Sequence, residues 1–317
     1  MSSAQRNRAV DVLKLVLALM VVGIHSNPFA ALGRTAILLT GDGLFRLAVP
    51  VFLLFNGYFL HAALLRGRGW GYVRHAAQLY VLWMLLYLPL YYPLLAARGF
   101  WPNLRTLIFG YWHLWYLAGM VLAGALIVLI QAWPSRRLAW LTACSFLGGI
   151  LVTYGMAFGV ITPDKTIFSD PLLANRNPLF LCLPFMLAGL LIAREDLAER
   201  FDLSRLQLLA LLGIALTLAE SLLMARYAVK GVAHDNLLAL GLAAPCLMLL
   251  ALKSRAGLKG RALGDYASGI YFIHVAYCAL LFRFTGFSHL VIYAIAVVGS
   301  VLLVALIRRA GLARRLL

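Results

Sequence analysis

Long apolar segments separated by short polar connections run the whole length of the chain. Each segment is about twenty residues long, which is what a helix needs to cross the hydrocarbon core of a bilayer. Helices are expected throughout because the open edge of a sheet leaves backbone groups unsatisfied in lipid. We predict an all-α, polytopic membrane protein with about ten transmembrane helices around a polar cavity, forming a single domain over residues 1–317. The predicted spans lie near 10–28, 43–63, 76–96, 112–131, 138–158, 178–193, 205–224, 236–253, 266–283 and 289–307.

The composition agrees with a membrane protein and excludes a nucleic-acid-binding role. Hydrophobic residues make up 63% of the 317 residues and charged residues only 12%, whereas soluble domains are about half apolar and a quarter charged. The formal net charge is +17. The basic residues occur in short clusters between apolar segments, as expected of a topology signal. We therefore expect contact with membrane lipids and no nucleic-acid partner.

The distribution of Lys and Arg also predicts the orientation. With the N-terminus inside, eighteen of the 28 basic residues fall in inside segments, nine fall outside, and Lys14 lies within the first span. This bias of about two to one favours cytoplasmic termini at both ends. We expect a multi-pass protein of the bacterial inner (plasma) membrane.

Three ionisable residues interrupt the first span. Asp11 and Lys14 lie one helical turn apart at its start, and His25 follows Lys14 by eleven residues. Eleven residues are about three turns, so Lys14 and His25 project to nearly the same face, about 16 Å apart along the helix. Ionisable groups within a span usually face a cavity or a partner rather than lipid. A polar path along this helix is expected, with His25 as a candidate general base. The alternatives are a structural histidine and an interfacial Asp11–Lys14 pair.

Other polar residues mark the second and fourth spans. Arg46 precedes the apolar run of the second span, either as an interfacial residue or as a cation that orients an acceptor or a carboxylate. Asn56 lies in the middle of that span and needs a hydrogen-bond partner. His113 and Trp115 open the fourth span; aromatic residues are usual at the membrane interface, whereas His113 is less ordinary there.

Two further candidates lie in later spans. Glu220 is in the middle of the seventh span, where a carboxylate is a functional candidate or half of a structural pair. His274 lies about two turns into the ninth span. The four cysteines have no metal or redox spacing, and we expect no metal. The connection at 159–177 is rich in turn residues and is either a lid or a simple connection.

Five short motifs, taken in order, resemble those of the acyltransferase-3 family of membrane proteins. They are a basic residue and a histidine eleven residues apart, an R-x-x-V-P-x-F with a later N-G-Y, an H-L-W-Y-L, a P-F-x-x-x-G, and a late segment containing Ser, Ile-Tyr and His. The matching residues are Lys14 and His25; Arg46, Val49, Pro50, Phe52, Asn56, Gly57 and Tyr58; His113 to Leu117; Pro184, Phe185 and Gly189; and Gly264 or Asp265, Ser268, Ile270, Tyr271 and His274.

This resemblance implies transfer of an acyl group, usually acetyl, from cytoplasmic acyl-CoA to a hydroxyl at the outer side, commonly on an envelope glycan. It implies an essential first-helix histidine and a basic residue near the CoA phosphates. We therefore expect acetyl-CoA or another acyl-CoA as donor. The expected catalytic residues are His25, Asp11 and His113; the expected donor-binding residues are Lys14 and Arg74. The expected substrate-binding residues are Arg46, Asn56, Trp115, Glu220 and His274.

The sequence departs from the family pattern at two of these positions. Asn56 replaces the usual Ser, and Lys14 replaces the commoner Arg, which loses bidentate phosphate binding but keeps a point charge. No hydrolase-like domain follows the tenth span, so an accessory envelope protein or a homo-oligomer is one expectation.

The start of the chain also resembles the membrane half of serine racemases from vancomycin-resistance clusters. The alternative function is therefore a carrier or binding protein for a small amino acid such as serine or alanine. A subunit of an envelope complex is a third reading.

Overall fold

The computed structural model describes residues 6–162, 176–228, 235–254, 257–258 and 262–317. Its helical segments are α1 (Arg8–Ser26), η1 (Ala30–Leu32), α2 (Arg34–Thr40), η2 (Leu44–Leu47), α3 (Ala48–Leu64), α4 (Gly69–Ala96), α5 (Phe100–Phe109), η3 (Trp112–Leu114), α6 (Trp115–Leu129), α7 (Ser135–Ala157), η5 (Pro178–Cys182), α9 (Leu183–Arg194), α10 (Leu197–Arg200), α11 (Leu203–Tyr227), α12 (Leu240–Lys253), α13 (Ala262–Phe284), α14 (His289–Arg309) and α15 (Ala313–Leu316). Most of the connection at 159–177 lies outside these residues.

The predicted all-α class is confirmed, and every predicted span coincides with a helix. Among the described residues, eight helical segments are long and apolar enough to cross a membrane. The apolar segments Pro178–Arg194 and Leu240–Lys253 are shorter. The short helices α2, α5, α10 and α15 were not predicted. A two-residue strand pair, β1 (Arg6–Asn7) with β2 (Gly257–Leu258), is antiparallel and joins the start of α1 to the segment before α13.

Capping residues at both ends define where helix α1 begins and ends. The Asn7 side chain accepts hydrogen bonds from the backbone N–H groups of Ala9 and Val10, which caps the helix. At the other end, Asn27 adopts a left-handed conformation (φ 49°) and donates its N–H to Gly23 at 2.9 Å. Asn is one of the few residues that tolerate this conformation, and the following proline cannot continue the helix. His25 is therefore held on the last turn of α1.

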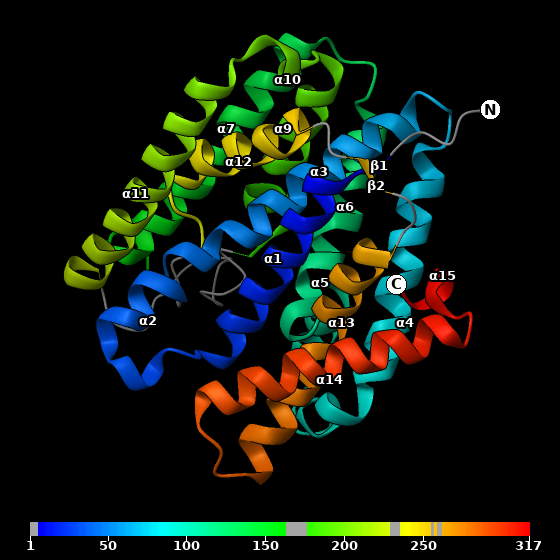
Figure 1. The fold of residues 1–317 in the computed structure, drawn as a ribbon, viewed down its shortest axis with the longest axis vertical. Coiled ribbons are helices and arrows are strands. Elements are labelled where there is room, and N and C mark those ends of the chain that lie inside the picture. The colour runs from blue at the N-terminus through cyan, green and yellow to red at the C-terminus, as the bar shows by residue number, and fades with distance from the viewer. Residues whose placement is uncertain (1–5, 163–175, 229–234, 255–256, 259–261) are drawn as a thin grey trace.

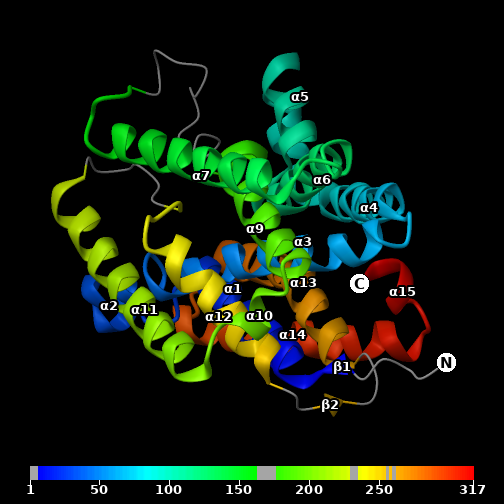
Figure 2. The same ribbon diagram turned by 90° about the horizontal axis from the view of Figure 1, so that it is seen from above.

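Helix α1 is central to the bundle and packs against α3, α12, α13 and α14. Figure 1 shows α1 and α13 running side by side, with α14 crossing next to them. In both views α2 lies at the opposite end of the molecule from β1, β2 and α15 (Figure 2). Small residues at the α1–α13 contact, such as Ala18 and Ala267, let the two helices approach closely.

Two glycines place α3 directly on α9. A Cβ added at Gly57 would collide with the backbone of Met186, and a Cβ at Gly189 would collide with the backbone of Leu54. The contact is reciprocal, so neither helix can carry a side chain at the crossing. This crossing sets the position of α3, which carries Asn56 and Phe52.

We predict that Gly57→Ala or Gly189→Ala destabilises the protein. The methyl group meets backbone atoms, which cannot move aside as a side chain can, so a loss of about 1–3 kcal/mol is expected. Thermal unfolding of detergent-solubilised protein should show a lower midpoint for both variants. Gly71→Ala is the matched control, because its added Cβ would have Arg68 as its nearest neighbour, at 3.9 Å. Equal midpoints for all three variants would contradict the reciprocal crossing.

Candidate active site

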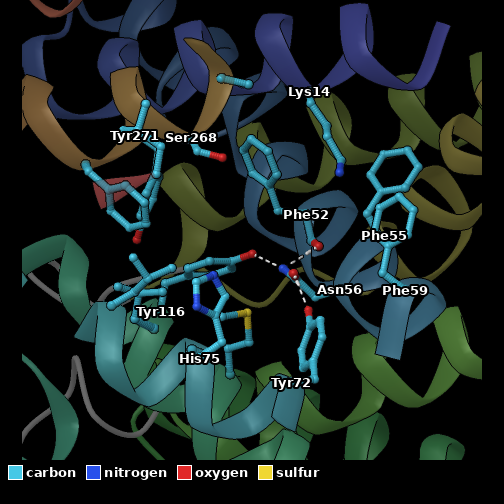
Figure 3. A pocket seen from close by; sticks show the side chains of 17 residues that line it. Lys14, Phe52, Phe55, Asn56, Phe59, Tyr72, His75, Tyr116, Ser268 and Tyr271 are labelled. Atoms are coloured by element: carbon cyan, nitrogen blue, oxygen red, sulfur yellow. Dashed lines mark hydrogen bonds between the residues drawn. The ribbon is translucent and has the colours of Figure 1, made fainter. Parts of the chain in front are cut away.

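A cavity of about 260 Å³ is lined by residues of α1, α3, α4, α6 and α13. We call it the Lys14 cavity, because the Lys14 side chain points into it from α1 (Figure 3). The Lys14 ammonium lies over two aromatic rings of α3, 4.3 Å from the centroid of Phe59 and 5.2 Å from that of Phe55. Such faces attract a cation and hold it in place.

Asn56 links three elements inside the Lys14 cavity. Its Nδ2 donates to the Phe52 carbonyl at 2.9 Å and to the Tyr116 hydroxyl, while its Oδ1 accepts from the Tyr72 hydroxyl at 2.7 Å. The predicted need for a partner at Asn56 is thus met by tyrosines of α4 and α6. With both ends of the amide bonded, Asn56 fixes the Tyr116 ring at one side of the cavity.

A second, smaller cavity of about 40 Å³ lies beyond these tyrosines. We call it the His25 cavity. It is lined by His25 together with Arg46, His113, Trp115, Arg176 and Asp235. Tyr116 and Tyr271 line both cavities. The two tyrosines therefore form the partition between a space that contains Lys14 and a space that contains His25.

Three histidines from three helical elements meet beside this partition. The ring centroid of His25 lies 5.2 Å from that of His274 and 6.3 Å from that of His113, and the last two are 5.4 Å apart. His113 and His274 are buried, with 2% and 0% of their surface exposed. Residues 88 and 249 positions from His25 in the sequence thus become its neighbours, which no local pattern could show.

Some ring nitrogens of the buried histidines make no hydrogen bond within the described part of the chain. His274 Nδ1 bonds to the Ile270 carbonyl at 2.9 Å, and its Nε2 has no partner among the described residues. Both ring nitrogens of His113 likewise lack a partner within the described part of the chain. A neutral imidazole always carries one N–H donor and one acceptor. A buried polar group without a partner is costly, so these nitrogens are expected to bond a substrate or water.

Three charged residues that pair with one another, Arg46, Arg176 and Asp235, line part of the His25 cavity. Arg46 bonds to Asp42 at 2.7 Å and also pairs with Asp235. Arg176 donates to Asp235 at 2.6 Å, and its guanidinium lies 5.9 Å from the Trp115 ring. Arg46 thus lines the cavity as expected of a substrate-binding residue, but two carboxylates already engage its terminal nitrogens. Its Nε has no partner in the described part of the chain, so this N–H remains available to a substrate.

Three predicted site residues, Glu220, Asp11 and Arg74, line neither cavity. Glu220 accepts from the backbone N–H groups of Leu238 and Ala239, at 2.7 and 2.8 Å, and from the Tyr154 hydroxyl. These bonds hold the chain that leads into α12 and give the half-buried carboxylate structural partners. Asp11, 2% exposed, lies fourteen residues before His25 on the same helix, about 21 Å away along its axis. That distance gives it no direct contact with the histidines. Arg74 is exposed on α4, beside His75, which lines the Lys14 cavity.

The sequence analysis missed the residues that complete the site. Tyr116 is part of the H-L-W-Y-L motif, and Tyr271 is part of the late motif, yet neither had an assigned role. Tyr72 carries no sequence signal at all. Asp235 and Arg176 are polar residues at the ends of spans, where charge alone is unremarkable. Within the described segments no group of three or more His, Cys, Asp or Glu side chains has the arrangement of a metal site.

The chain is similar in sequence to two curated racemases. The chain is 27% identical over 252 residues to a serine/alanine racemase of Enterococcus gallinarum and 25% identical over 291 residues to an amino-acid racemase of Enterococcus faecalis. These matches cover 73% and 85% of this chain but only 35% and 40% of the relatives. The chain thus spans well under half the length of these curated relatives. No solved structure matches it significantly.

A family model described as an acyltransferase domain matches residues 7–309. This range contains α1 to α14, all three histidines, and every residue that lines either cavity except Leu317. Because the match covers nearly the whole chain, the protein belongs to the acyltransferase-3 family of membrane proteins.

Proposed function

We propose that the protein transfers an acyl group, acetyl in the simplest case, from acyl-CoA at the cytoplasmic face to a hydroxyl at the outer face. The acceptor class is an envelope glycan or another hydroxyl-bearing molecule. One observation carries the proposal. The cavity lined by the Lys14 ammonium and the cavity lined by the His25 imidazole meet at the Tyr116–Tyr271 partition. A donor and an acceptor that approach from opposite sides need this arrangement. The extent of the family match supports treating residues 1–317 as one acyltransferase domain.

The donor occupies the Lys14 cavity in this proposal. The Lys14 ammonium would bind a CoA phosphate as a point charge. The pantetheine arm would run past Asn56 toward the tyrosine partition. In this position the arm would bring the thioester to His25. Arg74 is accessible on α4 and would interact with the nucleotide portion outside the cavity. The same side is cytoplasmic if the excess of Lys and Arg follows the usual orientation rule.

His25 and His113 supply the proposed chemistry. The His25 imidazole takes the proton of the acceptor hydroxyl as its oxygen attacks the thioester carbonyl. An N–H of His113, which has no described acceptor, donates to the developing oxyanion. The carbon–sulfur bond then breaks, the ester forms, and the CoA thiolate takes the proton from His25. His274 lies within 5.2 Å of His25, ring to ring, and would hold the imidazole in place.

The racemase relatives favour a second candidate, a carrier for a small amino acid. In that case Arg46 or Arg176 would bind a carboxylate in the His25 cavity. Uptake of labelled serine by proteoliposomes that contain no acyl-CoA separates the two candidates.

We expect His25→Ala to abolish acyl transfer without unfolding the protein. Loss of a positioned base costs about 10²–10⁴ in rate. Purified protein in nanodiscs is supplied with acetyl-labelled acetyl-CoA, and released CoA and label on protein or acceptor are measured. His61→Ala, on α3 outside both cavities, is the matched histidine control and should keep full activity. A fully active His25→Ala protein would remove the proposed base.

We expect Lys14→Met to weaken donor binding rather than the chemical step. Losing a charge-assisted bond of about 1.5–3 kcal/mol raises KM for acetyl-CoA roughly ten- to hundred-fold, with a smaller effect on kcat. S-acetylpantetheine lacks the nucleotide phosphates, so its KM should change little. Lys14→Arg should restore binding. An equal loss with both donors would place Lys14 in the fold rather than at the phosphate.

We expect both termini to lie in the cytoplasm. In a background with all four cysteines replaced by alanine, Gly286→Cys, between α13 and α14, should react with a membrane-impermeant maleimide in intact cells. Ser204→Cys, at the start of α11, should react only after the cells are opened. The reverse pattern would invert the orientation and the side assigned to the donor.

A further inference from the structure

Three aromatic rings lie together where the Lys14 cavity adjoins the His25 cavity. The ring centroids of Tyr116 and Tyr271 are 5.3 Å apart, and the Phe52 centroid is 6.5 Å from the first and 6.4 Å from the second. The rings come from α3, α6 and α13. All three line the Lys14 cavity, and the two tyrosines also line the His25 cavity. We call Phe52, Tyr116 and Tyr271 the ring triad.

Hydrogen bonds hold both tyrosines of the ring triad from opposite sides. The Tyr116 hydroxyl accepts from Asn56 in the Lys14 cavity. The Tyr271 hydroxyl donates to the His113 carbonyl at 2.5 Å, on the side of the histidines. Figure 3 shows Tyr116 and Tyr271 across the cavity from Lys14 and Phe59. Turning either ring aside would break one of these hydrogen bonds, so both rings are held in position.

Neighbouring side chains support the rings from behind. Tyr271 also contacts the His113 ring, with a centroid distance of 5.4 Å, and the Phe272 ring at 5.3 Å. Only 7% of Tyr116 and 6% of Tyr271 is exposed. On the side away from the Lys14 cavity, the Tyr271 ring therefore has packed neighbours. Beyond them, the His25 cavity of about 40 Å³ has room for only a few water-sized groups.

We propose that the ring triad selects the acyl group by length, admitting acetyl and propionyl groups and rejecting longer chains. The inference rests on the proposed function, because it assumes that the acyl group passes from the Lys14 cavity to His25. The carbonyl and methyl of an acetyl group match the few water-sized positions beyond the rings. Each further methylene must be forced among packed aromatic side chains, and such overpacking is unfavourable.

Phe52 is the member of the ring triad whose substitution best tests the proposed selection by acyl length. No hydrogen bond involves its side chain, so its truncation widens the passage and leaves the bonds of both tyrosines intact. Asn56 bonds to the backbone carbonyl of Phe52, which the substitution keeps. Tyr116→Phe makes the complementary change, because it keeps the ring and removes its hydrogen bond to Asn56.

The experiment measures kcat/KM of the protein in nanodiscs with acetyl-, propionyl-, butyryl- and hexanoyl-CoA. The wild type should lose at least tenfold between propionyl- and butyryl-CoA. Phe52→Ala should raise the butyryl-to-acetyl ratio tenfold or more, and Tyr116→Phe should raise it less. Leu79→Ala is the matched control, since Leu79 lines the Lys14 cavity outside the triad. It adds volume to the same cavity and should leave the ratio unchanged.

The possible outcomes test the length selection and the proposed acyltransferase function separately. Turnover of every chain length at equal kcat/KM by the wild type overturns the length selection and leaves the acyltransferase standing. The same holds if Phe52→Ala and Leu79→Ala shift the ratio equally, because cavity volume alone would then set the selectivity. If folded wild-type protein turns over no acyl-CoA at all, the proposed function fails and the length selection fails with it. A ratio that shifts only in the triad variants supports both.

Discussion

The fold depends on one constraint, that a polar group taken out of water must find a partner. Glu220 meets this requirement by accepting two backbone N–H groups before α12, and Asn56 meets it through two tyrosines. Arg46 meets it with two carboxylates. These groups hold elements together. His113 and His274 each keep a ring nitrogen without a partner in the described part of the chain, and Arg46 keeps its Nε free in the same way. These groups lie in or beside the His25 cavity, where a substrate or water can supply the missing hydrogen bond.

The site combines rigid and accessible parts. Lys14 and His25 share one straight helix, so their separation is set by the helical rise and cannot change with side-chain packing. The partition between them is assembled from α3, α6 and α13, and its position follows from the α3–α9 crossing at Gly57 and Gly189. The close backbone contact between α3 and α9 therefore helps to set where the Lys14 cavity and the His25 cavity meet.

Much of the site was predictable because its residues break the membrane pattern. Lys14, His25, His113 and His274 stand out as ionisable groups within or next to apolar segments, and Asn56 as a polar residue within a span. Glu220 stood out equally and proved to have structural partners, because sequence cannot show which buried charges are satisfied. Tyr72, Tyr116 and Tyr271 were not recognised, since tyrosine is ordinary in a membrane helix. Only the hydrogen bonds seen in the structure distinguish a tyrosine that separates the two cavities from one that merely packs between helices.

The sequence by itself determined the helical spans, through the length of its apolar runs, and the shared face of Lys14 and His25, through the helical period. It also determined where α1 ends, because Asn27 and Pro28 stop the helix just after His25. Only the tertiary structure decided that His113 and His274 join His25, and that two tyrosines divide the polar path. The reason is physical: helical periodicity relates residues a few turns apart, whereas contacts across hundreds of residues depend on how helices cross and which small residues let them approach.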